Sequence, residues 1–494
     1  MEFKILKKDI LKTTYDAVVV GTFEDQPISG HLLEIDRAMD GALKAIMEEE
    51  GFKGKENSVL LIHTLNKIAP KRIIIAGLGK REEFNTEKVR RAAANGIKKA
   101  EDVKAKNIAA LPFFYEHISR EEVIQAMVEG MGLMTYKFDK HKEKKEEEKR
   151  EIDTVEFITE DGDALKDALD RGLIITEAVN FVRDIVNEPA NIITPKRLSE
   201  IALELSEKNK ELLSCKVYGV DEIKKMGMGA FEAVAKGSDN PACFIHILYK
   251  PYNKTPKKKV AIVGKGLTFD SGGLNIKTGQ HMRFMKTDKA GACAVLGVMS
   301  ALPKLNIDVE VHGIIAAVEN MPSGRAMKPD DIVTAKNGKT IEISNTDAEG
   351  RLTLADALCY TVEQKVDRII DLATLTGACI IALGDYTVGV MGNNQDFIDE
   401  ILKVSEAAGE HMWQLPFYDQ MRDKIKSDVA DLNNTGGRYG GAITAGMFLE
   451  HFVNSTPWVH MDIAGPAFNE KGWSYNPKGA TGVGVRTLIR YLLR

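Results

Sequence analysis

The sequence predicts an α/β protein with a small N-terminal α/β domain and a larger, doubly wound α/β domain built on a mixed central sheet. Its 494 residues exceed what one hydrophobic core usually supports, which favours two domains. Short apolar runs alternate with segments of helical periodicity, and this alternation is typical of α/β folds. Two acidic, glycine-rich segments each follow an apolar run, so we expect them at the carboxyl ends of strands, where such folds bind ligands.

The N-terminal domain is expected to span residues 1–160 and to contain mostly parallel strands. The pattern predicts strands at 16–20, 58–63, 72–76, 107–111 and 155–157, and helices at 32–49 and 86–105. No catalytic constellation occurs in this part. The mixed charges of residues 140–151 predict a solvated loop or hairpin tip; a polyanion-binding patch is disfavoured because the acids cancel the bases.

A helix linking the domains is expected within residues 161–187, and residues 188–494 form the larger domain. Apolar residues keep a helical period from 165 to 186, and Pro189 ends that helix soon after. The further predicted elements are helices at 196–212 and 292–302, strands at 216–218, 244–249, 259–263, 309–317 and 368–372, and a helical turn at 374–377. The run 244–249 is expected to be a central strand.

The first acidic segment is the octet 345–352, which reads Asn-Thr-Asp-Ala-Glu-Gly-Arg-Leu and lies between a predicted strand at 338–344 and a buried helix. Gly350 is expected to permit a sharp bend. Asp347 and Glu349 are two positions apart, so an extended backbone would let both carboxylates converge on one point. Converging carboxylates repel unless a cation lies between them, which favours a divalent metal. A solvated acidic turn that caps the next helix is the alternative.

The second segment covers residues 263–277 and 285–291. It places Lys265, Asp270, Lys277 and Asp288 among glycines, after the predicted strand 259–263. Gly264 and Gly266 resemble part of a nucleotide-binding loop, but the third glycine is missing and no Gly-Lys-Ser/Thr follows, so we reject that interpretation.

Composition narrows the function classes. The net charge of -5 calls for neither a nucleic-acid nor a membrane partner, and no apolar stretch approaches the roughly 20 residues of a membrane span, so we expect a cytoplasmic protein. The five cysteines lack close pairing and are expected to be buried free thiols. No Gly-x-Ser-x-Gly motif occurs, and none of the ten histidines falls inside either segment. Hydrolysis would therefore depend on acids that act through metal.

The octet, together with 269–273 (Phe-Asp-Ser-Gly-Gly) and 187–191 (Asn-Glu-Pro-Ala-Asn), resembles the leucyl aminopeptidase (cytosol aminopeptidase) family of two-metal exopeptidases. The resemblance is strong over residues 160–494 and weak before them. It implies two divalent ions per subunit, Mn, Zn or Co, held by Lys265, Asp270, Asp288, Asp347 and Glu349, with Asp270 and Glu349 bridging. As a ligand, Lys265 would have to be a neutral amine; the alternative is a salt bridge to Asp270.

The resemblance also implies roles for two other cations. Lys277 would stabilise the developing oxyanion of the scissile carbonyl, and Arg351 would hold a bicarbonate ion that acts as general base. Ordinary charge neutralisation is the alternative for both. The implied side-chain pocket consists of Met285, Thr374, Gly377, Ala464 and Ala467. Ala467 is small where some relatives carry a larger residue, so Phe or Met could enter as well as Leu.

Other positions match or depart from the family pattern. Residues 432–438 and 460–465 match it and are expected to line or support the site. Asp330 stands where relatives usually have glycine, which is expected to alter only a turn.

The function implied is a cytoplasmic metal-dependent aminopeptidase that releases leucine or other apolar N-terminal residues from peptides with a free N-terminus. A water or hydroxide activated by two ions would attack in the doubly wound catalytic domain, and the chain would assemble as a homohexamer. The alternatives are a two-metal hydrolase of another ester or amide, such as a phosphate ester, and a second role in DNA binding. The apolar pocket disfavours the first, and the net charge gives the second no support.

Overall fold

The structure is a computed structural model that describes residues 1–24, 26–143, 152–252 and 255–494. The chain separates into two compact units. The smaller contains Met1–Glu177 and Lys471–Pro477, and the larger contains Ala178–Glu470 and Lys478–Arg494. Helix α5 (Lys166–Asn187) runs through the point where the chain passes from one unit to the other. The predicted α/β class with a smaller N-terminal part is confirmed; the boundaries at 160 and 187 stay predictions.

The smaller unit is built on a six-stranded sheet with the order β1-β6-β5-β2-β4-β3. Its strands are β1 (Glu2–Leu6), β2 (Ala17–Thr22), β3 (Val59–His63), β4 (Arg72–Gly77), β5 (Asn107–Ala110) and β6 (Thr154–Ile158). All neighbours pair in parallel except β3, which is antiparallel to β4. The expectation of mostly parallel strands is therefore confirmed.

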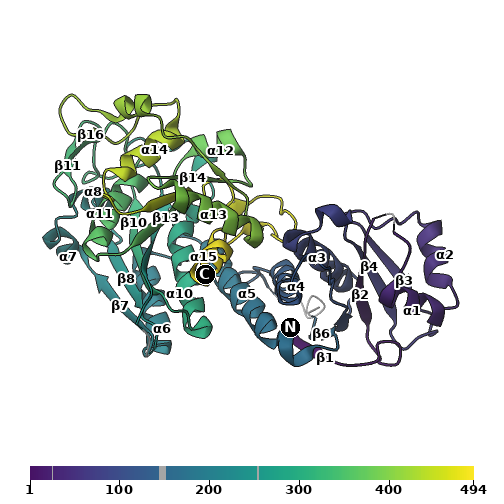
Figure 1. Cartoon of the computed structure of the whole chain (residues 1–494). Coiled ribbons are helices and arrows are strands. Elements are labelled where there is room, and N and C mark those ends of the chain that lie inside the picture. The colour runs from purple at the N-terminus through teal and green to yellow at the C-terminus, as the bar shows by residue number, and fades with distance from the viewer. Residues whose placement is uncertain (25, 144–151, 253–254) are drawn as a thin grey trace. The chain divides into compact units, whose positions relative to one another are not determined.

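Helices cover both faces of this sheet because its central strands are apolar on both sides (Figure 1). The helices are α1 (Gly30–Ala38) and α2 (Ala42–Glu49) on one face, and α3 (Thr86–Asp102) and α4 (Arg120–Met134) on the other. The single helix predicted at 32–49 is interrupted, because Asp40 and Gly41 adopt φ of 58° and 80°. Residues 144–151 of the mixed-charge run lie outside the described residues.

The larger unit is built on an eight-stranded sheet with the order β15-β14-β17-β13-β9-β10-β8-β7. Its strands are β7 (Leu213–Tyr218), β8 (Cys243–Tyr249), β9 (Lys259–Asp270), β10 (Glu310–Asn320), β13 (Arg368–Ala373), β14 (Val388–Gly392), β15 (Met412–Gln414) and β17 (Trp458–Asp462). The pairs β7/β8, β8/β10 and β14/β17 are antiparallel and the rest parallel, so the predicted mixed sheet is confirmed. The strand predicted to be central, β8, lies next to the edge strand β7 instead.

Helices lie on both faces of the eight-stranded sheet (Figure 1), as expected for a doubly wound fold. Helices α8, α11 and α14 form a common core with one face, and α6, α10 and α15 pack on the opposite side. The helices of this unit are α6 (Pro195–Lys208), α7 (Val220–Lys225), α8 (Gly229–Ala235), α9 (Gly279–Met282), α10 (Ala290–Leu305), α11 (Gly350–Glu363), α12 (Gly377–Leu383), α13 (Gln395–Ala408), α14 (Gly441–Glu450) and α15 (Val485–Leu492).

Two small sheets complete the larger unit. One consists of β11 (Ile332–Thr334), β12 (Thr340–Glu342) and β16 (Leu432–Asn433), and the other of β18 (Phe468–Asn469) and β19 (Gly479–Ala480). Asp330, just before β11, has φ of 72°. This left-handed conformation favours glycine but is tolerated by aspartate. The positive φ of Asp330 is a physical reason why glycine suits this position.

Two further expectations concern the chain as a whole. Among the described residues, no helix combines the length and apolar character that a membrane span needs. All five cysteines are free; Cys215 is partly buried and the other four are buried, which confirms the expected free thiols.

A buried chain of hydrogen bonds joins the neighbouring strands β8 and β10 to helix α11 in the larger unit. The Nε2 atom of His246 on β8 lies 3.0 Å from Nδ1 of His312 on β10, and its Nδ1 lies 3.0 Å from the hydroxyl of Tyr360 on α11. Burial lowers the pKa of His246 from its usual 6.5 to about 4. The unfolded chain therefore binds more protons between these values, so the free energy of unfolding decreases as pH falls below 6.5.

We expect a His246→Gln variant to lose less stability than the wild type between pH 7.5 and pH 4.5, because glutamine does not titrate. The difference is at most about 3 kcal/mol. Urea unfolding in the presence of a chelator, followed at both pH values, measures it. An equal loss of stability in wild type and variant would contradict this account of His246.

Candidate active site

Strand β9 carries two of the predicted site residues. It extends to Asp270, so the expectation that Lys265 and Asp270 follow the end of a strand at Val263 is wrong. Lys265 lies within the strand, and Asp270 is its last residue. The glycines do not break the strand: a Cβ at Gly264 would lie 2.5 Å from the carbonyl oxygen of Gly291, so glycine is needed there for α10 to pack closely.

The two acidic segments interlock through Thr346. Its hydroxyl donates to the carbonyl of Gly272 at 2.6 Å, and its backbone N–H donates to Oδ1 of Asn275 at 2.8 Å. Gly272 has φ of 88°, and a Cβ there would lie 2.9 Å from Oδ1 of Asp347. The loop after β9 and the octet therefore meet in space. Residues 346 and 347 form a turn rather than the extended backbone expected from sequence.

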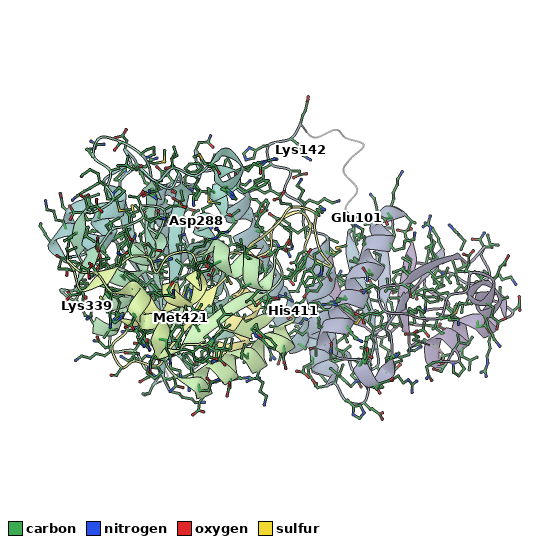
Figure 2. The ribbon with its side chains drawn as sticks, turned by 90° about the horizontal axis from the view of Figure 1, so that it is seen from above. Glu101, Lys142, Asp288, Lys339, His411 and Met421 are labelled. Atoms are coloured by element: carbon green, nitrogen blue, oxygen red, sulfur yellow. The ribbon has the colours of Figure 1, made fainter. Side chains whose placement is uncertain are left out.

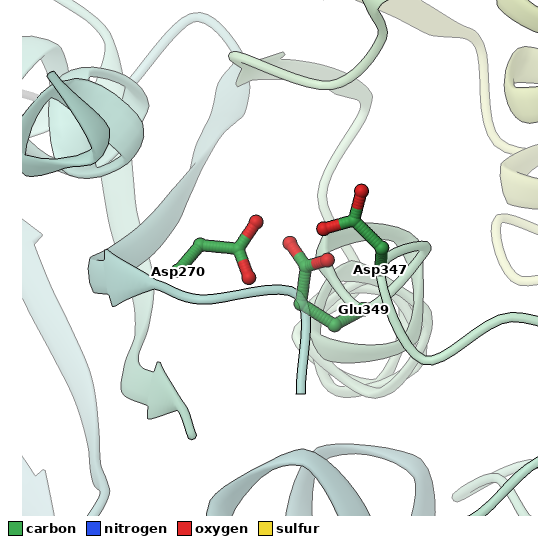
Figure 3. Close-up of side chains that lie close together, drawn as sticks. All are labelled: Asp270, Asp347 and Glu349. Carbon is green, nitrogen blue, oxygen red and sulfur yellow. The ribbon is translucent and has the colours of Figure 1, made fainter. Parts of the chain in front are cut away.

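Three carboxylates converge where these loops meet (Figure 3). Asp270, Asp347 and Glu349 each offer an oxygen, and these oxygens lie within 4.8 Å of one another. Asp270 comes from the end of β9, Asp347 from the turn, and Glu349 from the residue just before α11.

Lys265 joins Asp288 to this cluster. Asp288, labelled in Figure 2, lies on the short 3₁₀ helix Met285–Lys289. Its side chain is buried. The Nζ atom of Lys265 lies 2.8 Å from Oδ1 of Asp288 and 3.1 Å from Oε1 of Glu349. The salt-bridge partners of Lys265 are therefore Asp288 and Glu349, not Asp270 as the alternative interpretation held.

The surroundings of Lys265 also explain Gly350. A Cβ at Gly350 would lie 2.5 Å from Cε of Lys265, so glycine makes room for the lysine. The expected sharp bend is not the reason, because Gly350 is the first residue of α11 and has no left-handed φ. Although burial by itself lowers the pKa of Lys265, the charges of Asp288, Glu349 and Asp270 raise it above its usual value.

Lys277 lies on the other side of the carboxylates. Its Nζ atom lies 2.8 Å from Oδ2 of Asp270 and 2.6 Å from Oδ1 of Asp347. Burial lowers the pKa of Lys277, but the charges of Asp270, Glu349 and Asp347 raise it well above the usual value, so the ammonium stays charged. This side chain can present a positive charge beside the cluster.

The four acids disfavour one another's negative charge, and a divalent metal would balance that charge. Burial raises the pKa of Asp288 and of Asp347, and burial together with the charge of Asp270 raises the pKa of Glu349 to about 8. Within the described residues, Oδ2 of Asp288 and Oε2 of Glu349 are buried without a hydrogen-bond partner. Oxygen atoms that are buried and unsatisfied in an acidic cluster need a cation.

Arg351 is held at the edge of the site by Asn434. Its Nη1 atom donates to the carbonyl of Asn434 at 2.9 Å, and the Asn434 amide donates to the carbonyl of Asn345 at 2.7 Å. Burial lowers the pKa of Arg351 to about 10, which still leaves it charged at neutral pH. Among the described residues, Nε of Arg351 is buried without a hydrogen-bond partner. The guanidinium therefore retains donor capacity for an anion.

Sequence reasoning missed Asn320, which orients a ligand candidate, while Asn434 supports the octet from a segment that was expected to do so. Asn320, the last residue of β10, donates through Nδ2 to Oδ1 of Asp270 at 2.9 Å and to the carbonyl of Thr346 at 3.1 Å. The predicted strand stopped at 317, three residues short of it. Asn434 lies in the segment 432–438, which supports the octet. No residue of that segment lines the cavity described next.

A cavity of about 480 Å³ opens beside the carboxylates. Of the five predicted pocket residues, four line it: Met285, Thr374, Gly377 and Ala464. Ala467 does not; it is buried, with its backbone bonded to Ile463 and Thr481. The pocket expectation for Ala467 is therefore not supported by the structure.

The cavity wall contains other residues that sequence reasoning did not single out. Ile276 and Ile380 add exposed apolar surface. His281, which lies in the sequence between residues 263–277 and 285–291, also lines the cavity. His281 lies only four positions after Lys277, and this closeness in sequence to a predicted site residue could have indicated that it lines the cavity.

Comparisons with known proteins identify relatives over the whole chain. The family model described as "Cytosol aminopeptidase family, catalytic domain" matches residues 180–489, and the model described as "Cytosol aminopeptidase family, N-terminal domain" matches residues 19–145. A probable cytosol aminopeptidase of Sulfurihydrogenibium sp. (strain YO3AOP1) is 52% identical, over 100% of this chain and 98% of the relative. A probable cytosol aminopeptidase of Aquifex aeolicus (strain VF5) is 49% identical, over 100% of this chain and 98% of the relative.

Solved structures share the fold. A mutant of tomato leucine aminopeptidase is similar, with a TM-score of 0.91 and 36% identity, over 100% of this chain and 96% of that one. The bottromycin maturation enzyme BotP in complex with Mn has a TM-score of 0.86 and 31% identity, over 97% of this chain and 99% of that one.

Proposed function

The chain belongs to the cytosol aminopeptidase family and is thus a metal-dependent aminopeptidase, and we propose that it uses two divalent ions to release apolar N-terminal residues, leucine among them, from peptides. The observation that carries the two-ion proposal is the cluster of Asp270, Asp347 and Glu349, which Lys265 extends to Asp288. Asp288 is not among the three acids whose oxygens converge, so an ion held by those three would leave Asp288 available to a second ion. The cluster also borders the cavity.

Asp270, Asp347 and Glu349 would hold one ion, and Asp270, Glu349, Asp288 and Lys265 the other. The bound ions would supply an activated water and polarise the scissile carbonyl. Lys265 can become a ligand only as a neutral amine, so the cations must displace the proton that Asp288 and Glu349 now stabilise. Mn, Zn and Co all suit such oxygen and nitrogen ligands, and BotP is a relative in complex with Mn.

Lys277 would stabilise the charge that develops on the carbonyl oxygen. Its ammonium is charged and is held beside Asp270 and Asp347, so no reorganisation is needed when the charge forms. Arg351 would bind a planar anion such as bicarbonate, which could accept the proton of the attacking water; its buried, unpartnered Nε supports this proposal.

The specificity proposed for the substrate follows from the cavity. The free α-amine of a peptide would bind one of the proposed ions as a neutral ligand, while Met285, Ile276 and Ile380 offer apolar contacts to the first side chain. A blocked amine would lose the first interaction. Assembly as a homohexamer is also part of this proposal, and light scattering would test it.

The experiment that tests the proposal measures hydrolysis of leucine p-nitroanilide by purified protein. We expect activity to disappear after chelation and to return with Mn, Zn or Co, because the acids alone provide no activated water. N-acetyl-leucine p-nitroanilide should remain intact under the same conditions. Calorimetric titration of the chelated protein with Mn should show two ions per chain.

Two outcomes would contradict this proposal. Equal hydrolysis of the acetylated substrate would exclude recognition of a free amine. Hydrolysis of p-nitrophenyl phosphate in place of the aminoacyl anilide would favour the phosphate-ester alternative.

A further inference from the structure

Asp462, the last residue of β17, is fully buried and accepts three hydrogen bonds from two loops. Its Oδ1 accepts from the backbone N–H of Leu375 and of Ala464, both at 3.2 Å. Its Oδ2 accepts from the hydroxyl of Thr376 at 2.7 Å. A buried carboxylate is costly unless its oxygens are satisfied, and these donors satisfy both of them.

The loop that Asp462 holds is also bonded to two metal-ligand candidates. The hydroxyl of Thr374 donates to Oδ1 of Asp288 at 2.6 Å, and the carbonyl of Thr374 accepts from Nζ of Lys265 at 2.9 Å. Three consecutive residues, 374 to 376, therefore connect Asp462 to the cluster. A shift of this short loop would displace the side chains of Asp288 and Lys265.

The same loop begins one wall of the cavity. Thr376 is the N-cap of α12, and its hydroxyl oxygen accepts from the backbone N–H of Cys379 at 3.0 Å. Helix α12 carries Gly377 and Ile380, which line the cavity, and Ala464 lines it from the second loop that Asp462 holds. One buried carboxylate thus fixes the start of the α12 wall and the position of Ala464.

We propose that Asp462 is a positioning residue that couples the side-chain pocket to the metal site, through its hydrogen bond to Thr376. The role rests on the proposed aminopeptidase function, because the pocket is assigned by it. Asp462 itself touches neither the cavity nor the metal-ligand candidates by any hydrogen bond among the described residues. It acts through residues 374–376 and Ala464.

The test compares Asp462→Asn, Thr376→Val, Thr376→Ser and the double variant Asp462→Asn/Thr376→Val. Steady-state kinetics with leucine, phenylalanine and alanine p-nitroanilides give kcat and KM for each. We expect kcat/KM for the leucine substrate to fall roughly 10- to 100-fold in Asp462→Asn and Thr376→Val, with KM rising and the preference for leucine over alanine shrinking. Thr376→Ser keeps the hydroxyl and should fall less than Thr376→Val.

The double variant separates this coupling from two independent defects. Both single changes remove the hydrogen bond between Thr376 and Asp462, and Thr376→Val also removes the N-cap acceptor of Cys379, so the loss in the double variant should be smaller than the product of the two single losses. A product of the two single effects would overturn the proposal, as would an unchanged preference for leucine in both single variants.

A readout without catalysis distinguishes failure of this proposal from failure of the proposed function. Calorimetric titration of chelated protein with Mn should show about tenfold weaker binding in Asp462→Asn, because Thr374 no longer holds Asp288 and Lys265 in place. Wild-type protein that cleaves no free-amine substrate would defeat the proposed function, and the Mn titration would still test the coupling. If circular dichroism shows that Asp462→Asn does not fold, the same measurements on Thr376→Val test the proposal. Mn affinity and substrate preference equal to those of the wild type in Thr376→Val would overturn it.

Discussion

Glu349→Gln should abolish measurable peptidase activity while leaving the fold intact. Glu349 is almost completely buried, lies in the carboxylate cluster and contacts Nζ of Lys265 at 3.1 Å. Glutamine has the same shape and can still accept from Lys265, but it lacks the negative charge that a divalent ion requires. We expect kcat to fall on the order of 10³-fold, which equals about 4 kcal/mol of transition-state stabilisation.

The Glu349→Gln variant should also bind Mn more weakly than the wild type. The loss of Mn affinity should exceed the roughly 10- to 100-fold that removal of an outer-shell partner costs. Calorimetric titration and the increase of Tm on adding Mn measure it, and the Tm of the chelated variant should stay close to that of the chelated wild type. Glu363→Gln, at the exposed end of the same helix, is the matched control and should leave both properties unchanged.

Normal Mn affinity in Glu349→Gln would show that this carboxylate is not a ligand. A large fall in the Tm of the chelated variant would instead indicate that Glu349 holds α11 and β9 together through Lys265. The two readouts therefore separate a ligand from a structural ion pair.

Lys277→Met should lower activity without weakening metal binding. Lys277 carries the positive charge proposed to stabilise the oxyanion, so its loss should reduce kcat about 10²- to 10³-fold with a smaller change in KM. In the structure the same ammonium pairs with Asp270 and Asp347, two ligand candidates. Removing it removes a cation that competes with the metal, so Mn affinity should rise or stay equal.

Steady-state kinetics with leucine p-nitroanilide and Mn titration of the chelated protein measure both effects. Lys328→Met, which removes an exposed lysine that forms an ion pair with Asp331, is the matched control. A Lys277→Met variant that loses Mn affinity and activity together would contradict the oxyanion role and indicate that Lys277 is needed to assemble the site.

Much of the fold was predictable from local pattern. Strands such as β4 and β13 appear within one residue of the predicted runs, because an apolar stretch of that length between turn residues has few alternatives. The helix predicted at 32–49 divides into two because left-handed backbone at Asp40 and Gly41 interrupts an otherwise continuous apolar period. The extension of β9 to Asp270 was missed because glycine normally marks a turn.

The candidate site was predictable only in part. Asp347 and Glu349 are close in sequence and were recognised by type and spacing, whereas Asn320 is an ordinary polar residue at a strand end with no local signal. Asn434 and Asp462 lie in the segments 432–438 and 460–465, which were expected to line or support the site, but nothing local assigned them a role. Their significance depends on partners far along the chain: Asp462 bonds Thr376 across 86 positions. His281 and the exclusion of Ala467 from the cavity wall likewise depend on side-chain placement.

The sequence by itself determined the α/β class, the two acidic segments and the residue types that suit a divalent metal, because periodicity and residue chemistry are local properties. Only the tertiary structure decided which acids share a lysine, which asparagines orient them and which carboxylate holds the pocket loop. The physical reason is the strand order β17-β13-β9-β10, which places the carboxyl ends of β9, β10, β13 and β17 near one another although the chain visits them out of sequence. Contacts between the carboxyl ends of strands depend on how the strands pair, and a short stretch of sequence does not determine that pairing.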